Sequence, residues 1–546
     1  MNKTSILIAT IAALPLIGSG MLLATPIGLS QKSLSYIGAF RVPHGKYNGT
    51  NFASNPFVNA QYQPFAYNPV NNSLFMGQVS GLATAPKRVG EFTIPEIIDP
   101  ATISYDIEKL SQSSVIQVPQ DLSEGNFDRI RLNGNIPGDE AKAQLGGLYV
   151  YNGKLLGTVW GYYDANGALS YRSHFSANLD WTNQYGFNGL HAVGVSPTGS
   201  YANGGFVGGY MTKVPSYYRA QIGFPMLTGR TGGPIVSRSS YGPTLWGFDP
   251  SSFNFDTPAP AKMFIGYPDA HQTLGGYSDT PSVMFNRSSG VKGVIWPEGT
   301  NSIMFFGSIG LGIKFDDEGV PVINNAPACE GPGTSSRSEA KTNFELLNMK
   351  VNSWTCGYQV LDSNNISNGD SCCFDPINPD YAAHHNKFVI GDGGSCYGPG
   401  TKTVEEARTN GWLKEHSPSS YTCGGLTMSG EDIAQGSGCC FVGTLSTDKG
   451  GTAYPSIYRV WQYDANDIIE VKNGTKKAWE LIPKIWTFDL PFVNPERSRG
   501  LLGVAFDEDR KLVYIAQPFS DGNYPLIHVF KLDLTPAPSK TPLEIE

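Results

Sequence analysis

Short strand-like runs, each closed by turn residues, recur along the chain and restrict its fold more than any other feature. Gly147–Tyr151, Ile303–Phe306 and Lys511–Ile515 are rich in aliphatic and aromatic residues. Asn152-Gly153 and Asn473-Gly474 lie beside such runs, and this dipeptide favours hairpin turns because both residues tolerate positive φ. With 64 glycines, 12% aromatic and only 16% charged residues, the sequence predicts an all-β fold.

The strand-rich runs group into blocks of roughly 40 to 70 residues, a spacing typical of β-propeller blades with long loops. The blocks lie near 34–117, 143–182, 188–256, 261–325, 326–395, 396–450 and 453–534. The last block is long enough for more than one sheet. We therefore expect residues 25–546 to form a single β-propeller domain with seven blades. A pair of packed β-sandwiches is the structural alternative.

All eight cysteines fall in a duplicated region. Two units, 329–395 and 396–450, carry them at identical spacings: Cys329, Cys356, Cys372 and Cys373 in the first, and Cys396, Cys423, Cys439 and Cys440 in the second. The flanking Gly331–Thr334 also matches Gly398–Thr401. In an exported chain this predicts a cysteine-rich duplicated insertion with two disulfides per unit. A metal site assisted by His384 and His385 is the alternative, but the common zinc spacing is absent.

The first residues have the pattern of an export signal. Lys3 precedes an apolar run from Ile6 to Ile17, and small residues follow before Thr25. A positive start, an apolar centre and small residues predict a signal peptide over Met1–Ala24, and hence a secreted protein, extracellular or periplasmic. The alternative is a retained membrane anchor, which Gly18–Gly20 would interrupt. No other segment is apolar enough to span a membrane.

Charge and motifs exclude several classes of function. A formal net charge of −8 argues against a nucleic acid partner, because phosphate binding needs a basic surface. The chain has no nucleophile elbow, metalloprotease helix or phosphate-binding loop. No cofactor is required by any motif. An oxygen-rich loop could hold a structural calcium, although most such loops are plain turns; it contains Asp362, Asn364, Asn365, Asn368 and Asp370.

Histidine, arginine and tyrosine gather in the central third of the chain. His174, His191 and His271 lie in three consecutive blocks, and successive blades can direct them toward one face. Cations and tyrosines accompany them: Arg172, Tyr218, Arg219, Arg238, Tyr241, Tyr267 and Arg287. These residue types are ordinary on sheet edges. Together they are also what a groove for an anionic sugar needs, since arginine pairs with carboxylates and aromatic rings stack on pyranoses.

Eliminative cleavage of a uronate polymer requires the same groups. A cation neutralises the carboxylate, a base of near-neutral pKa removes the C5 proton, and an acid protonates the leaving oxygen. Hydrolysis would instead need two carboxylates across the scissile bond. Asp249 and Asp269 are available, but both lie in proline turns that explain them structurally.

The order His174, His191, Tyr267, Arg287 resembles the His–His–Tyr–Arg arrangement of the seven-bladed ulvan lyases. The resemblance implies a polysaccharide lyase in which His174 or His191 is the base or acid, Tyr267 is its proton-transfer partner and Arg287 neutralises the uronate. The remaining candidates are then expected to bind the anionic polysaccharide: Arg172, Tyr218, Arg219, Arg238, Tyr241 and His271. A non-catalytic propeller that binds glycan or protein is the alternative, and hydrolysis ranks third.

Overall fold

The structure is a computed structural model. It describes residues 26–45, 64–77, 87–131, 143–161, 169–194, 204–231, 240, 242–267, 273–274, 284–285, 289–310, 456–492, 501–522 and 524–535, and the backbone of short strands between 355 and 454. Statements about structure below concern these residues.

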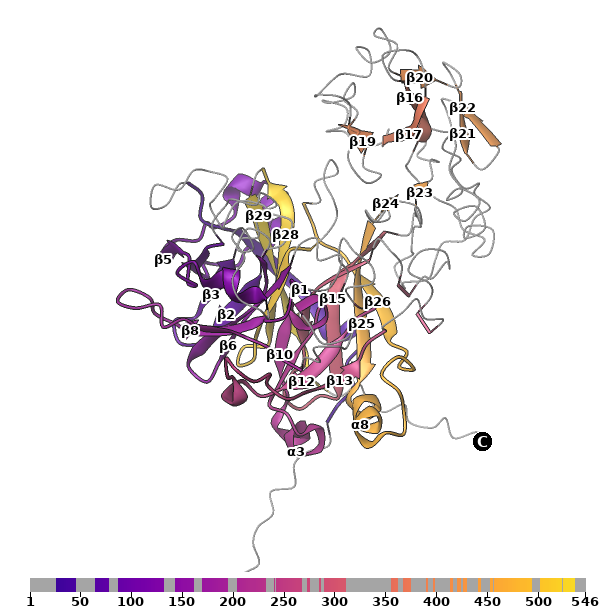
Figure 1. Ribbon diagram of the computed structural model, residues 1–546. Coiled ribbons are helices and arrows are strands. Elements are labelled where there is room, and N and C mark those ends of the chain that lie inside the picture. Colours follow the sequence, from indigo (N-terminus) through magenta and orange to yellow (C-terminus); the bar gives the residue numbers. More distant parts are fainter. Residues whose placement is uncertain are drawn as a thin grey trace, which may run out of the picture.

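Five antiparallel sheets of four strands each form the body of the protein (Figure 1). From the inner to the outer strand they are β2 (Phe65–Asn68), β3 (Ser73–Gly77), β4 (Val89–Thr93) and β5 (Val115–Gln120) in blade 1; β6 (Ala143–Tyr151), β7 (Lys154–Gly161), β8 (His174–Asn178) and β9 (Asn188–His191) in blade 2; β10 (Met211–Lys213), β11 (Met226–Thr228), β12 (Leu245–Phe248) and β13 (Ala261–Ile265) in blade 3; β14 (Gly290–Ile295), β15 (Ser302–Gly310), β25 (Ser456–Asp464) and β26 (Lys484–Phe488) in blade 4; and β27 (Gly503–Asp507), β28 (Leu512–Asp521), β29 (Tyr524–Leu532) and β1 (Leu34–Arg41) in blade 5.

The first strand of each sheet lies at the centre of a ring. β2, β6, β10, β14 and β27 contact one another in this order, and β27 returns to β2. The ring closes through β1, which pairs antiparallel with β29 from Leu34↔Leu532 to Arg41↔Leu526. In Figure 1 the indigo N-terminal strand accordingly lies beside the yellow C-terminal ones. The fold is therefore a five-bladed β-propeller.

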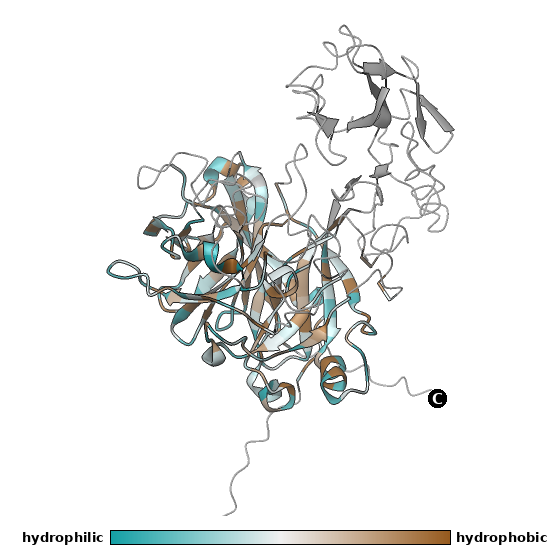
Figure 2. Cartoon of the chain, viewed as in Figure 1, coloured by the Kyte–Doolittle hydropathy of each residue, from teal (hydrophilic) through white to brown (hydrophobic). Residues whose placement is uncertain are grey.

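The hydrophobic core is divided into layers between neighbouring blades. Phe75 and Phe175 belong to the layer between blades 1 and 2, and Met226 and Phe248 to the layer between blades 2 and 3. Three further layers separate blades 3, 4 and 5 and join blade 5 to blade 1. Figure 2 shows many apolar residues, in brown, along the strands of the propeller. Burial between blades explains why strands such as β3 are buried on both faces.

Glycines allow the inner strand of blade 2 to meet the segment just before β10 backbone to backbone. A Cβ on Gly146 would lie 1.8 Å from the carbonyl oxygen of Gly208, and one on Gly147 would lie 2.1 Å from that of Gly209. These contacts leave no room for any side chain. The spacing of the blades at the centre thus depends on glycine at these positions.

The predicted seven blades are wrong, because the described strands form five. Block 34–117 was expected to be one blade, but its first strand belongs to blade 5 and the others to blade 1. β15 and β25 are direct neighbours, although residues 311–455 lie between them in the sequence. None of the described strands of that segment belongs to a blade of the ring. Its strands form small separate sheets: β16 (Thr355–Leu361), β17 (Ser367–Phe374) and β20 (Leu413–Glu415); β18 (Val389–Ile390) and β19 (Cys396–Tyr397); β21 (Ser420–Cys423) and β22 (Leu426–Ser429); β23 (Cys440–Val442) and β24 (Thr452–Tyr454).

Several predictions fall outside the described residues. They are the signal peptide over Met1–Ala24, the side chains of the calcium loop at 362–370, and the choice between disulfides and zinc at the cysteine side chains. Of the calcium loop, only the backbone of Asn368 and Asp370 is described, within β17. Among the described helices, none is both long and apolar enough to cross a bilayer. These features remain predictions from the sequence.

Helices are short and lie in the connections between strands. Their ranges are α2 (Gly204–Val207), α3 (Arg219–Ile222), α8 (Ala465–Asn473), and the 3-10 helices η1 (Gln31–Ser33), η3 (Pro100–Ile103), η4 (Ile107–Lys109), η5 (Asn126–Ile130), η6 (Ser216–Tyr218) and η8 (Pro250–Ser252). Asn152-Gly153 does form the predicted hairpin turn, between β6 and β7, with both residues at positive φ. Asn473-Gly474 does not: Gly474 ends α8 in the left-handed conformation.

Candidate ligand-binding site between blades 2 and 3

The two central histidines lie opposite each other in blade 2. His174 begins β8, His191 ends β9, and the two are paired across the ladder. Both side chains are buried. The predicted proximity of the two histidines is therefore correct. Its cause differs from the one expected, because they are paired within a single blade and do not come from successive blades.

His174 connects blade 2 to blade 3. Its Nδ1 is 2.8 Å from Ser173 Oγ and its Nε2 is 3.1 Å from Thr228 Oγ1 on β11. Its ring packs against Phe248, with centroids 4.9 Å apart. Burial, with a smaller contribution from His191, lowers the pKa of His174 to about 3. The imidazole is neutral, and both its nitrogens are engaged by hydroxyl groups.

His191 lies between this layer and the surface. Its Nε2 is 3.1 Å from Asn188 Oδ1, and its ring stacks on Phe253 at 4.8 Å with an interplanar angle of 15°. Burial lowers the pKa of His191 and the charge of Arg172 lowers it further, against the raising effect of the Asn254 and Asn188 backbone. His191 is thus neutral at pH 7, in the form that can accept a proton.

Arg172 is a buried cation that forms no ion pair with a carboxylate in the part of the chain that the structure describes. It is 8% exposed, and its Nη1 donates to the backbone carbonyls of Arg129 and Arg131 at the end of η5. Its guanidinium lies 4.2 Å from the ring centroid of Phe255. Within the described part of the chain, its Nε has no hydrogen-bond partner. Burial lowers the pKa of Arg172, although Tyr171 and Asp256 act in the opposite direction.

A groove of about 420 Å³ adjoins this cluster. Asn188 and Phe253, which contact His191, form part of its wall. Its other lining residues come from both blades: Tyr151, Asn152, Lys154, Leu156 and Ser176 from blade 2, and Pro225, Asp249, Pro250 and Ser251 from blade 3. The volume is in the range of small-ligand sites, and aromatic rings among amides and hydroxyls suit a sugar.

The other predicted residues do not join this cluster. Tyr267 is 1% exposed in the apolar layer between blades 3 and 4. Its hydroxyl donates to the Leu481 carbonyl at 2.5 Å and lies 3.0 Å from that of Tyr463. A substrate cannot reach it there, so this geometry does not fit the predicted catalytic role.

Tyr218 and Arg219 lie in η6 and α3, between β10 and β11. Tyr218 is buried against Trp296, and burial, with a further contribution from Asp464, raises its pKa to about 12. Arg219 Nε donates to the Val214 carbonyl. Four further candidates lie outside the described residues: Arg238, Tyr241, His271 and Arg287.

Tyr267→Phe tests the structural interpretation of this tyrosine. We expect the free energy of unfolding to fall by about 1–2 kcal/mol, because the Leu481 carbonyl loses its donor. Urea unfolding of this variant should be compared with that of Tyr217→Phe, because the Tyr217 hydroxyl makes no hydrogen bond in the described structure. Loss of polysaccharide cleavage at unchanged stability would instead support the predicted catalytic role of Tyr267.

Sequence analysis missed Asn188, Phe253 and Phe255. Asn188 lies three residues before His191, and the two phenylalanines follow the Phe-Asp-Pro turn. That turn behaves as expected, since Asp249 Oδ1 accepts from the Ser251 backbone N–H at 2.8 Å and Asp249 caps the start of η8.

Among the described residues, no group of three or more histidine, cysteine or acidic side chains could hold a metal ion.

Comparison with known proteins adds no assignment. No protein-family model and no curated protein matches the chain. Among solved structures, the chain is similar to the hemagglutinin-neuraminidase ectodomain of parainfluenza virus 5, at 8% identity over 92% of this chain and 85% of that one, with a TM-score of 0.18. A likeness at this level carries no argument, so fold and site rest on the chain's own geometry.

Proposed function

We propose that this chain is a secreted propeller that binds an anionic, uronate-containing glycan at the edge between blades 2 and 3. The observation that carries the proposal is Arg172, a buried guanidinium with no carboxylate partner in the described structure. Leaving a charge buried without a counter-ion is costly, and a ligand carboxylate would remove that cost. The planar fork of arginine suits a uronate carboxylate.

The groove supplies the contacts that the rest of a sugar needs. Tyr151 and Phe253 offer aromatic faces, and Asn152 and Asn188 offer amides for hydroxyl groups. Lys154 adds a second cation at the same edge, where its Nζ is 2.8 Å from Asn178 Oδ1. A bound polymer would then meet two cations, Lys154 in the groove wall and Arg172 within the electrostatic reach of His191.

Binding by an Arg172→Met variant tests the proposal. We expect at least tenfold weaker binding of ulvan or polygalacturonate in isothermal titration, because a charge-assisted hydrogen bond contributes about 1.5–3 kcal/mol. The matched control is Arg129→Met, which removes the same charge from an exposed neighbour. Equal weakening in both variants would mean that only net charge matters, and absence of binding by the parent protein would refute the proposal.

The electrostatic effect of Arg172 on His191 supports β-elimination as a second candidate. A neutral imidazole beside a guanidinium is the base and neutraliser pair that removal of a C5 proton requires. Because His191 is 3% exposed, the groove would have to open at Phe253 and Asn188. A rise in ultraviolet absorbance from unsaturated uronate, lost in His191→Ala, would establish the lyase. Binding without such a product would leave the non-catalytic function.

A further inference from the structure

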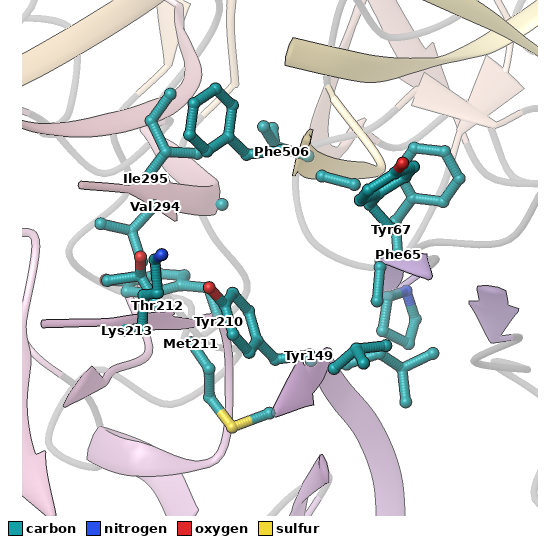
Figure 3. Close-up of a pocket in the computed structure, with 18 of the residues that line it drawn as sticks. Phe65, Tyr67, Tyr149, Tyr210, Met211, Thr212, Lys213, Val294, Ile295 and Phe506 are labelled. Atoms are coloured by element: carbon teal, nitrogen blue, oxygen red, sulfur yellow. The ribbon is translucent and has the colours of Figure 1, made fainter. Parts of the chain in front are cut away.

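The central channel is a separate cavity to which the sequence assigned no role. Its volume is about 260 Å³, and all five inner strands contribute to its wall. Figure 3 shows side chains from these strands arranged around an open centre. The cavity lies just below the usual range for ligand sites of about 300–1,000 Å³. It has room for a small molecule but not for a folded partner.

Aromatic side chains from several blades form part of the channel wall. Phe65 and Tyr67 of β2, Tyr149 of β6 and Phe506 of β27 line it and are labelled in Figure 3. Burial raises the pKa of Tyr149, so its hydroxyl stays protonated and can donate a hydrogen bond. Phe506 and Tyr67 are only partly buried, which leaves ring surface accessible to a bound molecule.

Charged groups from three blades meet where inner strands end. Lys213, the last residue of β10, places its Nζ 3.3 Å from Glu298 Oε1 and 3.4 Å from Glu508 Oε2. Lys511 holds the other oxygen of Glu508 at 2.6 Å. Glu298 in turn accepts from the backbone N–H and the hydroxyl of Ser216. Burial pushes the pKa of Glu298 upward, but these hydrogen bonds and Lys213 outweigh it and leave the pKa lowered.

One oxygen of this cluster is not satisfied by hydrogen bonding. Glu508 Oε2 is shielded from solvent and has no hydrogen-bond partner in the described structure, because Lys213 approaches it without hydrogen-bond geometry. A buried acceptor in this state gains from a donor supplied by a ligand. Lys213 and Lys511 balance Glu298 and Glu508. Of the other charged residues of the wall, Asp507 is paired with Arg510, and Lys292 and Asp509 carry opposite charges. The site therefore favours a neutral donor over a cation.

We propose that the central channel binds one neutral sugar ring. Its hydroxyl groups donate to Glu508 and accept from Lys213, and its apolar face stacks on Phe506 or Tyr67. This inference is independent of the anionic site between blades 2 and 3. It involves residues of blades 1, 3 and 5 that the first site does not use.

Titration with methyl glycosides of glucose, galactose and xylose tests the inference, by calorimetry and by ligand-observed NMR. Saturable binding of at least one glycoside is expected, weakened at least tenfold by Glu508→Gln. Glu480→Gln, the same change on a glutamate outside the channel, should leave the affinity unchanged. Phe506→Leu provides a second variant that keeps an apolar side chain, and it should weaken binding severalfold through lost stacking.

Three results would overturn the inference. They are no saturable binding of any of the three glycosides, equal affinities for Glu508→Gln and Glu480→Gln, and loss of binding in Arg172→Met with the channel variants unaffected. The last result would place the neutral sugar at the first site. Glycoside binding that depends on Glu508 while Arg172→Met retains full polyuronate affinity would support the channel and refute the proposed function, so the two are separable.

Discussion

Lowering the pH from 7 to 5 is expected to lower the free energy of unfolding by about 4 kcal/mol. His174 and His528 are both buried, and burial lowers the pKa of each to about 3. In the unfolded chain these side chains take up protons near pH 6.5, whereas in the folded protein they remain neutral. The stabilisation from keeping these two histidines neutral is therefore fully present above pH 6.5. It decreases by about 2 kcal/mol for each histidine as the pH falls to 5.

Urea unfolding at pH 7, 6 and 5 measures this loss, and stopping at pH 5 keeps the carboxylates largely ionised. His528 Nε2 lies 2.7 Å from Gln517 Oε1, and its Nδ1 lies 3.0 Å from the Tyr36 hydroxyl. In His528→Gln the amide can still donate to Gln517 but no longer titrates. The decrease between pH 7 and 5 should then shrink to about 2 kcal/mol. The same decrease in parent and variant would show that His528 is not the group involved.

Replacing Gly146 by alanine is expected to prevent folding. The added Cβ would lie 1.8 Å from the Gly208 carbonyl oxygen and 2.7 Å from its carbon. Both are backbone atoms of the connection that leads from α2 into β10, so relief requires the entry to blade 3 to move away from blade 2. Overpacking of ordinary cores costs about 1–3 kcal/mol, and a clash with backbone should exceed this range. Loss of soluble protein, or a large drop in melting temperature, is the expected observation.

Gly290→Ala is the matched control. Gly290 also lies in an inner strand, but a Cβ added there would have Lys292 Cε as its nearest neighbour, at 3.8 Å, which is an ordinary contact. This variant should fold and melt like the parent. If Gly146→Ala does the same, the inner strand of blade 2 and the segment just before β10 are farther apart than the structure places them.

The sequence predicted the class of fold but not the number of blades. Strand content and the turn at Asn152-Gly153 are local properties, and both were correct. Blade number depends on which strands pair, and β1 pairs with β29 across almost the whole chain. The spacing of strand-rich blocks carries no information on such pairing. Local sequence is also ambiguous at short range. The dipeptide Asn473-Gly474 ends α8, whereas a hairpin turn was expected there.

For the candidate site, residue type was informative and accessibility was not. Arg172, His174 and His191 do gather, because β8 and β9 are consecutive strands of one blade. Tyr267 was selected by the same reasoning, but its position after β13 buries it in the apolar layer between blades 3 and 4. Whether a polar side chain faces a groove or the core depends on the neighbouring blade, which a single sequence does not show.

The pairing of β1 with β29 also fixes an order of events during synthesis. Leu34 emerges from the ribosome early, yet its partner Leu532 belongs to the last strand of the propeller. β1 cannot take its outer position in blade 5 until β29 has been synthesised, and closing so long a loop slows folding. During that interval β1 presents an unpaired edge that can join another chain. Correct assembly therefore depends on keeping nascent chains apart until each has closed its own ring.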